Sequence, residues 1–493
     1  MLESAEVGHK VTKDTYEREE SRLRVALLNG QFEMSAAGRG PILVLISGLE
    51  GGGRGETANK LNEWLDPRFM RTTAFGPGTP EEDTHPLAWR YWRALPPRGR
   101  IGIFLNAWYR RLAVAHARHD VNDAQFNARL QEVRQYEQML TDEGIVLLKF
   151  WIHLSRAGQK ERLRALASDP MTRWRVTATD KKALKHYNKY HDKWEQMLRE
   201  TSIGSAPWYV VEGTDANYRN LTIGKILHEA MVRINTGVKP VPRTAVAPAP
   251  SVVGNVALIR RLDLKLKLAE KPYEKELAKW QAKLAQLTQR KGFRDRSLIL
   301  AFEGSDAAGK GGAIRRVATS LDARQYIIVP IAAPTEEERA HPFLWRFWRQ
   351  VPARGGITIF DRTWYWRVLV ERVEKICSVA DWMRAYDEIN QFEEQLVHAG
   401  AVVCKFWLQI SKEEQLKRFA LREKIAFKQF KITPDDWRNR KKWAAYEQAV
   451  ADMVDRTSTE LAPWTLVEAE DKNFARVKIV RSIAQQLEHA LES

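Results

Sequence analysis

Cysteines and long apolar runs are both nearly absent from this chain. Cys377 and Cys404 are the only cysteines among 493 residues, which excludes a disulfide framework and a cysteine-rich zinc site. No stretch approaches the roughly 20 apolar residues that span a bilayer, and the first ten residues contain no apolar signal region. We therefore expect a cytoplasmic protein with reduced thiols and no membrane partner, although the sequence leaves association with a membrane surface open.

Acidic residues are outnumbered by basic ones. The chain carries 79 Lys and Arg against 62 Asp and Glu, a formal net charge of +17 at pH 7. Such an excess favours a polyanionic partner, which could be nucleic acid, an acidic membrane surface or a phosphate polymer. The alternative is a basic protein whose charged surface is simply solvated.

The sequence repeats itself once over most of its length. Residues 85–93 and 341–349 are identical at six of nine positions, at an offset of 256 residues (341 minus 85). The same offset relates several further pairs: Gly48 and Gly304, Trp108 and Trp364, Lys149 and Lys405, Trp208 and Trp464. So long a period excludes a solenoid and indicates the tandem duplication of a whole domain. We expect the repeated tryptophans to pack in the two cores.

The boundary between the two copies is visible as a change in composition. Residues 237–256 contain four prolines among small residues, which cannot form a helix or a central strand. We predict an extended linker at 237–256, between one domain at 1–236 and a second at 257–493.

Short apolar runs alternate with helical stretches in the second half. The expected strands cover 298–302, 326–329, 357–360, 402–408 and 465–467, and the clearest expected helices cover 271–291 and 313–320. This alternation predicts a three-layer α/β/α domain with a parallel sheet, of the P-loop kinase type, present twice.

The segment from Gly304 to Gly312 reads GSDAAGKGG and stands between an expected strand and an expected helix. In this context the pattern is typical of a phosphate-binding loop, because glycines let successive N–H groups converge on an anion at a helix N-terminus. The residues predicted to bind phosphate are Gly304, Ala307, Ala308, Gly309, Lys310, Gly311 and Gly312. Lys310 can follow the transferred phosphoryl group. A glycine-rich turn without a ligand is the alternative.

The loop lacks the Ser or Thr hydroxyl that normally follows the lysine and holds Mg²⁺, since Gly311 occupies that position. Asp306, inside the loop, is the candidate ligand in its place. A second candidate is Asp361, which ends an apolar strand as the Mg²⁺-holding Asp of phosphate-loop enzymes does. We predict that Asp306 and Asp361 hold Mg²⁺, or Mn²⁺ instead, and that Arg362 stabilises charge on the transferred group. An ion pair that only orients Asp361 is the alternative role for Arg362.

A basic stretch covers residues 412–442, with 11 Lys and Arg against five Asp and Glu. It follows an expected strand, where nucleotide kinases carry a mobile lid that closes over phosphates. We predict a helical lid here, with Arg418, Arg422, Lys428 and Lys431 as the residues that contact the polyanion. A solvated helix face is the alternative.

The first half carries a damaged copy of these groups. Its loop has Arg54 where the second half has Lys310, and Glu56 adds negative charge where an anion would bind. The strand that ends in Asp361 in the second half ends here in Leu105, which cannot bind Mg²⁺. We predict that the first half does not catalyse. It could act as a scaffold, mediate homo-oligomerisation or still bind a polyanion.

Four segments of the second half resemble the polyphosphate kinase type 2 family: residues 302–312, 334–338, 341–348 and 359–365. The resemblance extends over the whole second half and, in degenerate form, over the first. The fused arrangement is similar to the class that phosphorylates AMP, which implies the reaction AMP + polyphosphate(n) → ADP + polyphosphate(n − 1) with Mg²⁺. It also implies that Asp306, Lys310, Asp361 and Arg362 are essential.

The residue types agree with this reaction. Polyphosphate carries about one negative charge per phosphate. Binding such a polymer would account for the protein's net charge of +17, by analogy with nucleic-acid electrostatics. The AMP phosphate is already ionised, so positioning and charge neutralisation suffice without a general base. We expect inorganic polyphosphate and AMP or ADP as partners, and no nucleic acid. The alternatives are a nucleoside diphosphate acceptor such as ADP or GDP, another nucleotide as donor, or a non-catalytic polyanion-binding protein.

Overall fold

The computed structural model describes residues 2–117, 121–237, 256–425 and 434–492. The chain divides into two compact units: the first comprises residues 1–78, 91–243 and 334–345, and the second comprises residues 79–90, 244–333 and 346–493. The predicted linker at 237–256 falls almost wholly outside the described residues, as do Lys428 and Lys431 of the predicted lid.

The first half of the chain forms a parallel sheet with strand order β2-β3-β1-β4-β5. Its strands are β1 (Ile42–Gly48), β2 (Met70–Ala74), β3 (Ile101–Leu105), β4 (Val146–His153) and β5 (Trp208–Glu212). Its α-helices are α1 (Lys13–Ala36), α2 (Arg54–Trp64), α3 (Pro80–Asp83), α4 (Leu87–Ala94), α5 (Trp108–Ala117), α6 (Asp123–Asp142), α7 (Arg156–Ser168), α8 (Ala178–Lys185), α9 (Tyr187–Thr201) and α10 (Ala216–Asn235). Short 3₁₀ turns are η1 (Glu3–Ala5), η2 (Pro67–Phe69) and η3 (Arg173–Arg175).

The second half repeats this order as β7-β8-β6-β9-β10, again with parallel pairing between all neighbours. Its strands are β6 (Ser297–Gly304), β7 (Tyr326–Pro330), β8 (Ile357–Asp361), β9 (Ala401–Gln409) and β10 (Trp464–Glu468). Its α-helices are α11 (Ala257–Arg260), α12 (Glu270–Gln289), α13 (Lys310–Ala318), α14 (Glu336–Arg339), α15 (Trp345–Trp348), α16 (Val379–His398), α17 (Lys412–Lys424), α18 (Pro434–Lys441), α19 (Trp443–Thr457) and α20 (Lys472–Glu492). Shorter turns are η4 (Lys291–Asp295), η5 (Trp364–Trp366) and η6 (Arg367–Glu371).

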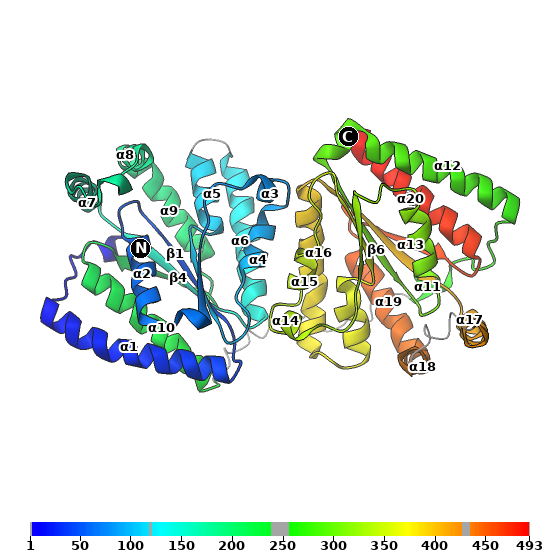
Figure 1. Cartoon of the computed structure of the whole chain (residues 1–493), viewed down its shortest axis with the longest axis horizontal. Coiled ribbons are helices and arrows are strands. Elements are labelled where there is room, and N and C mark those ends of the chain that lie inside the picture. The colour runs from blue at the N-terminus through cyan, green and yellow to red at the C-terminus, as the bar shows by residue number, and fades with distance from the viewer. Residues whose placement is uncertain (1, 118–120, 238–255, 426–433, 493) are drawn as a thin grey trace. The chain divides into compact units, whose positions relative to one another are not determined.

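Helices cover both faces of each sheet (Figure 1). In the second half α12 and α20 pack together over one face, and their apolar side chains join those of β6 and β9 in one core. Helices α16 and α19 pack together, and α16 lies against β9. Strands β4 and β9 are buried almost throughout, because a parallel sheet between two helical layers has no solvent-facing side. The predicted duplicated α/β fold with parallel sheets is confirmed.

The expected elements of the second half are present, with small shifts at their ends. All five expected strands form, and the helix expected over 271–291 is α12. The helix expected from residue 313 begins at Lys310 instead, because the glycine-rich loop turns directly into it. The repeated tryptophans, Trp108, Trp364, Trp208 and Trp464, are buried as expected.

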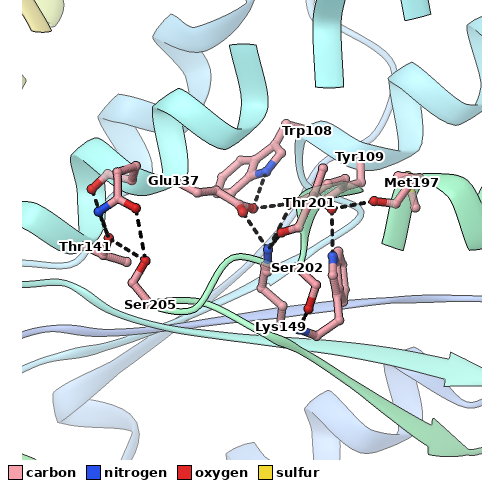
Figure 2. Close-up of polar contacts among 11 residues, drawn as sticks. Trp108, Tyr109, Glu137, Thr141, Lys149, Met197, Thr201, Ser202 and Ser205 are labelled. Carbon is pink, nitrogen blue, oxygen red and sulfur yellow. Dashed lines mark hydrogen bonds and ion pairs between the residues drawn. The ribbon is translucent and has the colours of Figure 1, made fainter. Parts of the chain in front are cut away.

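Each half contains a buried lysine–glutamate pair beside its sheet. In the first half, Lys149 of β4 lies 2.6 Å from the carboxylate of Glu137 on α6, and its Nζ also donates to the Thr201 carbonyl at 2.6 Å. Trp108 and Tyr109 both donate to the other oxygen of Glu137 (Figure 2). Burial lowers the pKa of Lys149, which the attraction of Glu137 opposes.

The second half repeats this network at the 256-residue offset. Lys405 lies 2.7 Å from Glu393 and donates to the Thr457 carbonyl at 2.7 Å, and both charged side chains are almost completely buried. Trp364 and Tyr365 donate to Glu393 at 2.9 and 2.7 Å. The network therefore ties β9 and α16 to the segment that directly follows Asp361 at the end of β8.

We expect Lys405→Met to lower the free energy of unfolding by about 3–5 kcal/mol, because Glu393 is then left as an uncompensated buried charge. Urea denaturation of the full chain followed by circular dichroism measures this. Adding Glu393→Gln should recover part of the loss, and Lys412→Met, at an exposed lysine, should change little. An unchanged urea midpoint in Lys405→Met would show that the pair does not stabilise the fold.

Candidate functional site

A cavity of about 770 Å³ opens at the carboxyl edge of the second sheet. Parallel α/β sheets bind their ligands at this edge, where loops leave the strands. The cavity brings together every described residue that the sequence indicated for the site, on β6, β8, α13 and α17: Gly304, Asp306, Ala307, Ala308, Gly309, Lys310, Gly311, Gly312, Asp361, Arg362, Arg418 and Arg422.

The loop at 304–312 forms one wall of this cavity, and two of its glycines are required by its shape. Gly304 has φ of 154°, and a Cβ there would lie 2.7 Å from the carbonyl oxygen of Leu408. Gly309 has φ of 113° and directly precedes α13. Ala307 also adopts a left-handed φ of 64°, which is uncommon for a residue with a side chain. The loop conformation therefore needs support from outside.

Lys310 and Asp306 are the two charged side chains of the loop, and both are engaged in hydrogen bonds. Lys310 Nζ donates to the Gly304 carbonyl at 2.6 Å, so the ammonium group lies over its own loop. The Asp306 carboxylate accepts from Arg362 at 3.4 Å and from Asn439 at 2.9 Å. Arg362 thus pairs with Asp306, whereas the alternative role considered for it required a pair with Asp361.

Glu303 is a cavity residue that sequence reasoning missed. It is the only charged residue of β6, it is 5% exposed, and it accepts from the backbone N–H and hydroxyl of Thr363 at 2.7 and 2.8 Å. Burial raises its pKa, which the nearby cations Lys310 and Arg362 oppose. Its contact fixes the turn after Asp361. A single acid in an otherwise apolar strand, next to Gly304, was the signal that could have found it.

The two described lid residues, Arg418 and Arg422, differ in burial and in what they contact. Arg422 lies half-exposed on the cavity wall, where burial lowers its pKa and Asp436 and Asp306 oppose that shift. Helix α18 adds Arg438 and Asn439 to the wall, both within the stretch predicted as the lid, and α20 adds Arg476, which lies outside it. Arg418, in contrast, is only 5% exposed: it lines the cavity, but its guanidinium is bound to backbone carbonyls.

The Arg418 guanidinium instead joins the loop to the end of β10. Its Nη1 donates to the carbonyls of Ala307 and Ala308 at 3.0 and 2.9 Å, and its Nη2 donates to those of Ala469 and Glu470 at 2.8 and 2.7 Å. We call this arrangement the guanidinium brace. It fixes two carbonyls of the loop, those of Ala307 and Ala308, against the segment that follows β10.

The first half has the same brace, built from a different helix. Arg219 on α10 donates to the carbonyls of Gly52 and Gly213 at 3.1 Å each. These two carbonyls correspond, at the 256-residue offset, to two of the four that Arg418 holds. Arg219 itself corresponds to Ala475 of α20, so the guanidinium occupies the same position although its helix differs.

In the first half, carboxylates of the loop form ion pairs with the arginines around it. Glu56 pairs with Arg162 at 2.6 Å, with Arg219 at 3.2 Å and with Arg175 at 3.3 Å. Arg54, in the place of the loop lysine, pairs with Glu50 and donates to Asn106 at 2.8 Å. The cations next to the first-half loop therefore already have carboxylate partners.

Two carboxylates, Asp306 and Asp361, are suitably placed on the cavity wall to hold a divalent cation. Among the described residues, no group of three or more His, Cys, Asp or Glu could form a complete metal cage. Mg²⁺ bound together with a phosphate needs only one or two carboxylates, since waters and phosphate oxygens complete its octahedron. The residues present fit this kind of cation.

A family model described as Polyphosphate kinase 2 matches residues 10–237 and 267–493. The chain is 52% identical, over 99% of its length and 99% of the relative's, to a polyphosphate:AMP phosphotransferase of Pseudomonas aeruginosa. It is 36% identical, over 94% of its length and 93% of the relative's, to a polyphosphate:AMP phosphotransferase of Acinetobacter johnsonii. The chain also matches a crystal structure of a polyphosphate kinase 2 from Pseudomonas aeruginosa. The match covers 100% of each chain, with a TM-score of 0.91 and 50% sequence identity.

Removing the brace should weaken anion binding at the loop. We expect Arg418→Ala to lower the affinity for inorganic triphosphate by roughly tenfold to a hundredfold, because buried carbonyls lose their donor at about 1–3 kcal/mol each and the loop relaxes. Titration calorimetry on the full chain measures this.

The first half supplies the rescue variant and α17 supplies the control. Arg418→Ala combined with Ala475→Arg should recover most of the affinity, since Arg219 provides the guanidinium from the corresponding position. Lys417→Ala removes a neighbouring exposed charge and should have a much smaller effect. Full affinity in Arg418→Ala, or no recovery in the double variant, would contradict the positioning role.

Proposed function

Since the chain belongs to the polyphosphate kinase 2 family, we propose that it transfers the terminal phosphoryl group of inorganic polyphosphate to AMP and so produces ADP. One observation carries this proposal: the chain is 52% identical, from end to end, to a polyphosphate:AMP phosphotransferase with the same two-domain organisation. The intact loop and the two cavity carboxylates of the second half supply the groups that phosphoryl transfer needs.

The second half, residues 257–493, is the catalytic domain in this proposal. The terminal phosphate of the donor lies in the loop, where the N–H groups of residues 307–312 and the N-terminus of α13 stabilise its charge. Lys310 exchanges its bond to the Gly304 carbonyl for a phosphate oxygen and stays with the phosphoryl group during transfer. Arg362, already held by Asp306 at 3.4 Å, neutralises charge on the transferred group.

Asp306 and Asp361 would hold Mg²⁺ or Mn²⁺ in the cavity. When bound, the cation supplies neutralisation of negative charge on the phosphate oxygens. The AMP phosphate attacks in its ionised form, so none of the cavity residues has to remove a proton. In this proposal residues 412–442 include the lid that excludes water, and Arg422 contacts the phosphates from the cavity wall. The predicted contacts Lys428 and Lys431 lie outside the described residues.

The first half, residues 1–236, is non-catalytic in this proposal. Leu105 stands at the position of Asp361, and the loop cations are paired with Glu50 and Glu56. The structure has, in the described ranges, no helix with the length and apolarity needed to cross a bilayer. We further propose a cytoplasmic location, which rests on the low cysteine content.

An assay with polyphosphate, Mg²⁺ and AMP, with the nucleotides separated, tests the reaction directly. ADP is the expected product. ATP formed from added ADP, without turnover of AMP, would favour a diphosphate acceptor, and the absence of any transfer would contradict the proposal.

Matched substitutions in the two loops test which half is catalytic. We expect Lys310→Ala and Asp361→Asn each to lower kcat by on the order of 100-fold or more, because charge developing on the phosphoryl group loses its stabilisation. Arg54→Ala, at the position corresponding to Lys310, should leave kcat within about twofold, a change too small to indicate a transition-state contact. Equal losses at both positions would show that both halves catalyse.

A further inference from the structure

Helices α7 and α8 and the turn η3 form a continuous basic surface on the first unit, at residues 156–185. Helix α7 packs against both η3 and α8, and Figure 1 shows α7 and α8 close together at the edge of that unit. The segment contains nine Lys and Arg but only three Asp and Glu. It corresponds, at the 256-residue offset, to the predicted lid of the second half, which has the same excess of six positive charges.

The charges of this surface are largely unneutralised. Apart from Arg175, which pairs with Glu56, seven cations are exposed: Arg156, Lys160, Arg164, Arg173, Lys181, Lys182 and Lys185. None of these seven lies within 4.0 Å of a carboxylate in the parts of the chain that the structure describes. Of the three acids, Asp180 is buried and caps its own helix. Elsewhere on the same unit, surface cations such as Lys60 and Lys225 pair with Glu20 and Glu19.

The spacing of these cations suits a linear polyanion. Arg156, Lys160 and Arg164 stand four residues apart on α7, so they lie on one face of the helix at steps of about 6 Å. Lys181 and Lys185 have the same spacing on α8. A row of separate charges can contact successive phosphates of one chain, whereas a single phosphate would need converging donors.

The comparison of the two halves shows which properties the first half has kept. It lacks the loop lysine and the strand-end aspartate, and Glu56 neutralises Arg162 and Arg175 next to its loop. Residues 156–185 nevertheless have the same excess of six positive charges as the predicted lid of the second half, and most of these cations are exposed to solvent. The groups for phosphoryl transfer are missing, but those for holding a polyanion remain.

We propose that this surface, α7–η3–α8, binds the part of a long polyphosphate chain that lies away from the catalytic loop. This inference rests on the proposed function, which makes polyphosphate the donor. It assigns the first half a role in retaining the polymer between transfers, because a chain held at a second place dissociates more slowly.

Polyphosphate fits this surface better than a single-stranded nucleic acid. Proteins that bind single strands without sequence preference stack successive bases on aromatic side chains. Trp174 is the one aromatic residue between 156 and 185, and although it is 72% exposed, Arg175 lies over its ring at 5.3 Å. The surface otherwise offers charge alone, which is what a chain of phosphates without bases requires.

The test compares long-chain polyphosphate with a short oligophosphate as donors for the full-length protein. The variant is Arg156→Gln/Lys160→Gln/Arg164→Gln, in which glutamine keeps the helix propensity of α7. The matched control is Arg18→Gln/Arg22→Gln/Arg24→Gln, which removes the same charge from three exposed arginines of α1. Direct binding of long-chain polyphosphate, of RNA of similar charge and of short oligophosphate is measured in parallel without AMP.

We expect the α7 variant to raise KM for the long chain on the order of tenfold and to flatten its salt dependence, since three phosphate contacts are lost. Turnover of the short donor and the behaviour of the α1 variant should stay close to those of the unaltered protein. Equal KM increases for both donors, an equal increase in the α1 variant, or no change at all would overturn the proposal. RNA bound more tightly than polyphosphate, with the α7 variant weakened, would also overturn it.

The two proposals fail in distinguishable ways. If the unaltered protein transfers no phosphate from either donor, the proposed function fails, and the binding measurements alone decide whether the surface holds polyphosphate. If it uses both donors and the α7 variant does not discriminate between them, only the docking surface is wrong.

Discussion

The buried lysine–glutamate pair is the interaction on which the geometry of both halves depends. A lysine and a glutamate taken out of water cost several kcal/mol each unless every polar atom finds a partner. In the second half, Lys405 and Glu393 meet this condition through Tyr365, Trp364 and the Thr457 carbonyl. Lys405 lies on β9, Glu393 on α16, and the two aromatic donors in the turn after β8. The network therefore fixes the strand end that carries Asp361 relative to β9 and α16. The pair recurs in the first half, where Leu105 and Arg54 stand at the positions of Asp361 and Lys310, so it serves the fold.

Patterns in the sequence were enough to predict the sheet, the duplication and the glycine-rich loop between β6 and α13. Each depends on a pattern that is visible along the chain itself: a short apolar run, a constant offset of 256 residues between similar segments, or glycines next to a lysine. The contents of the cavity were predictable only in part. Asn439 reaches Asp306 from 133 residues away, and no periodicity marks such a contact. Glu303 was visible as a charge in an apolar strand, but its partner Thr363 was not.

The direction of a charged side chain was the property that the sequence could not provide. Arg418 and Arg422 stand in one basic stretch and differ little in their neighbours along the chain. One turn of helix separates them and both line the cavity, yet Arg418 is buried with its guanidinium on backbone carbonyls, whereas Arg422 is partly exposed. The exchange between Arg418 and Arg219 makes the same point. What is maintained is the position of a guanidinium between two strand ends, and two different helices provide it.

The left-handed Ala307 has a consequence for the loop as a unit of structure. Where the first half has Gly51 at φ of 83°, the second half has a residue for which this conformation costs about 1–3 kcal/mol. The carbonyl of Ala307 is one of those that Arg418 holds, so the helix behind the loop offsets that cost. The nine residues are consequently not a portable motif. Grafted into another protein without a guanidinium behind them, they would retain the letters of a phosphate loop and lose its shape.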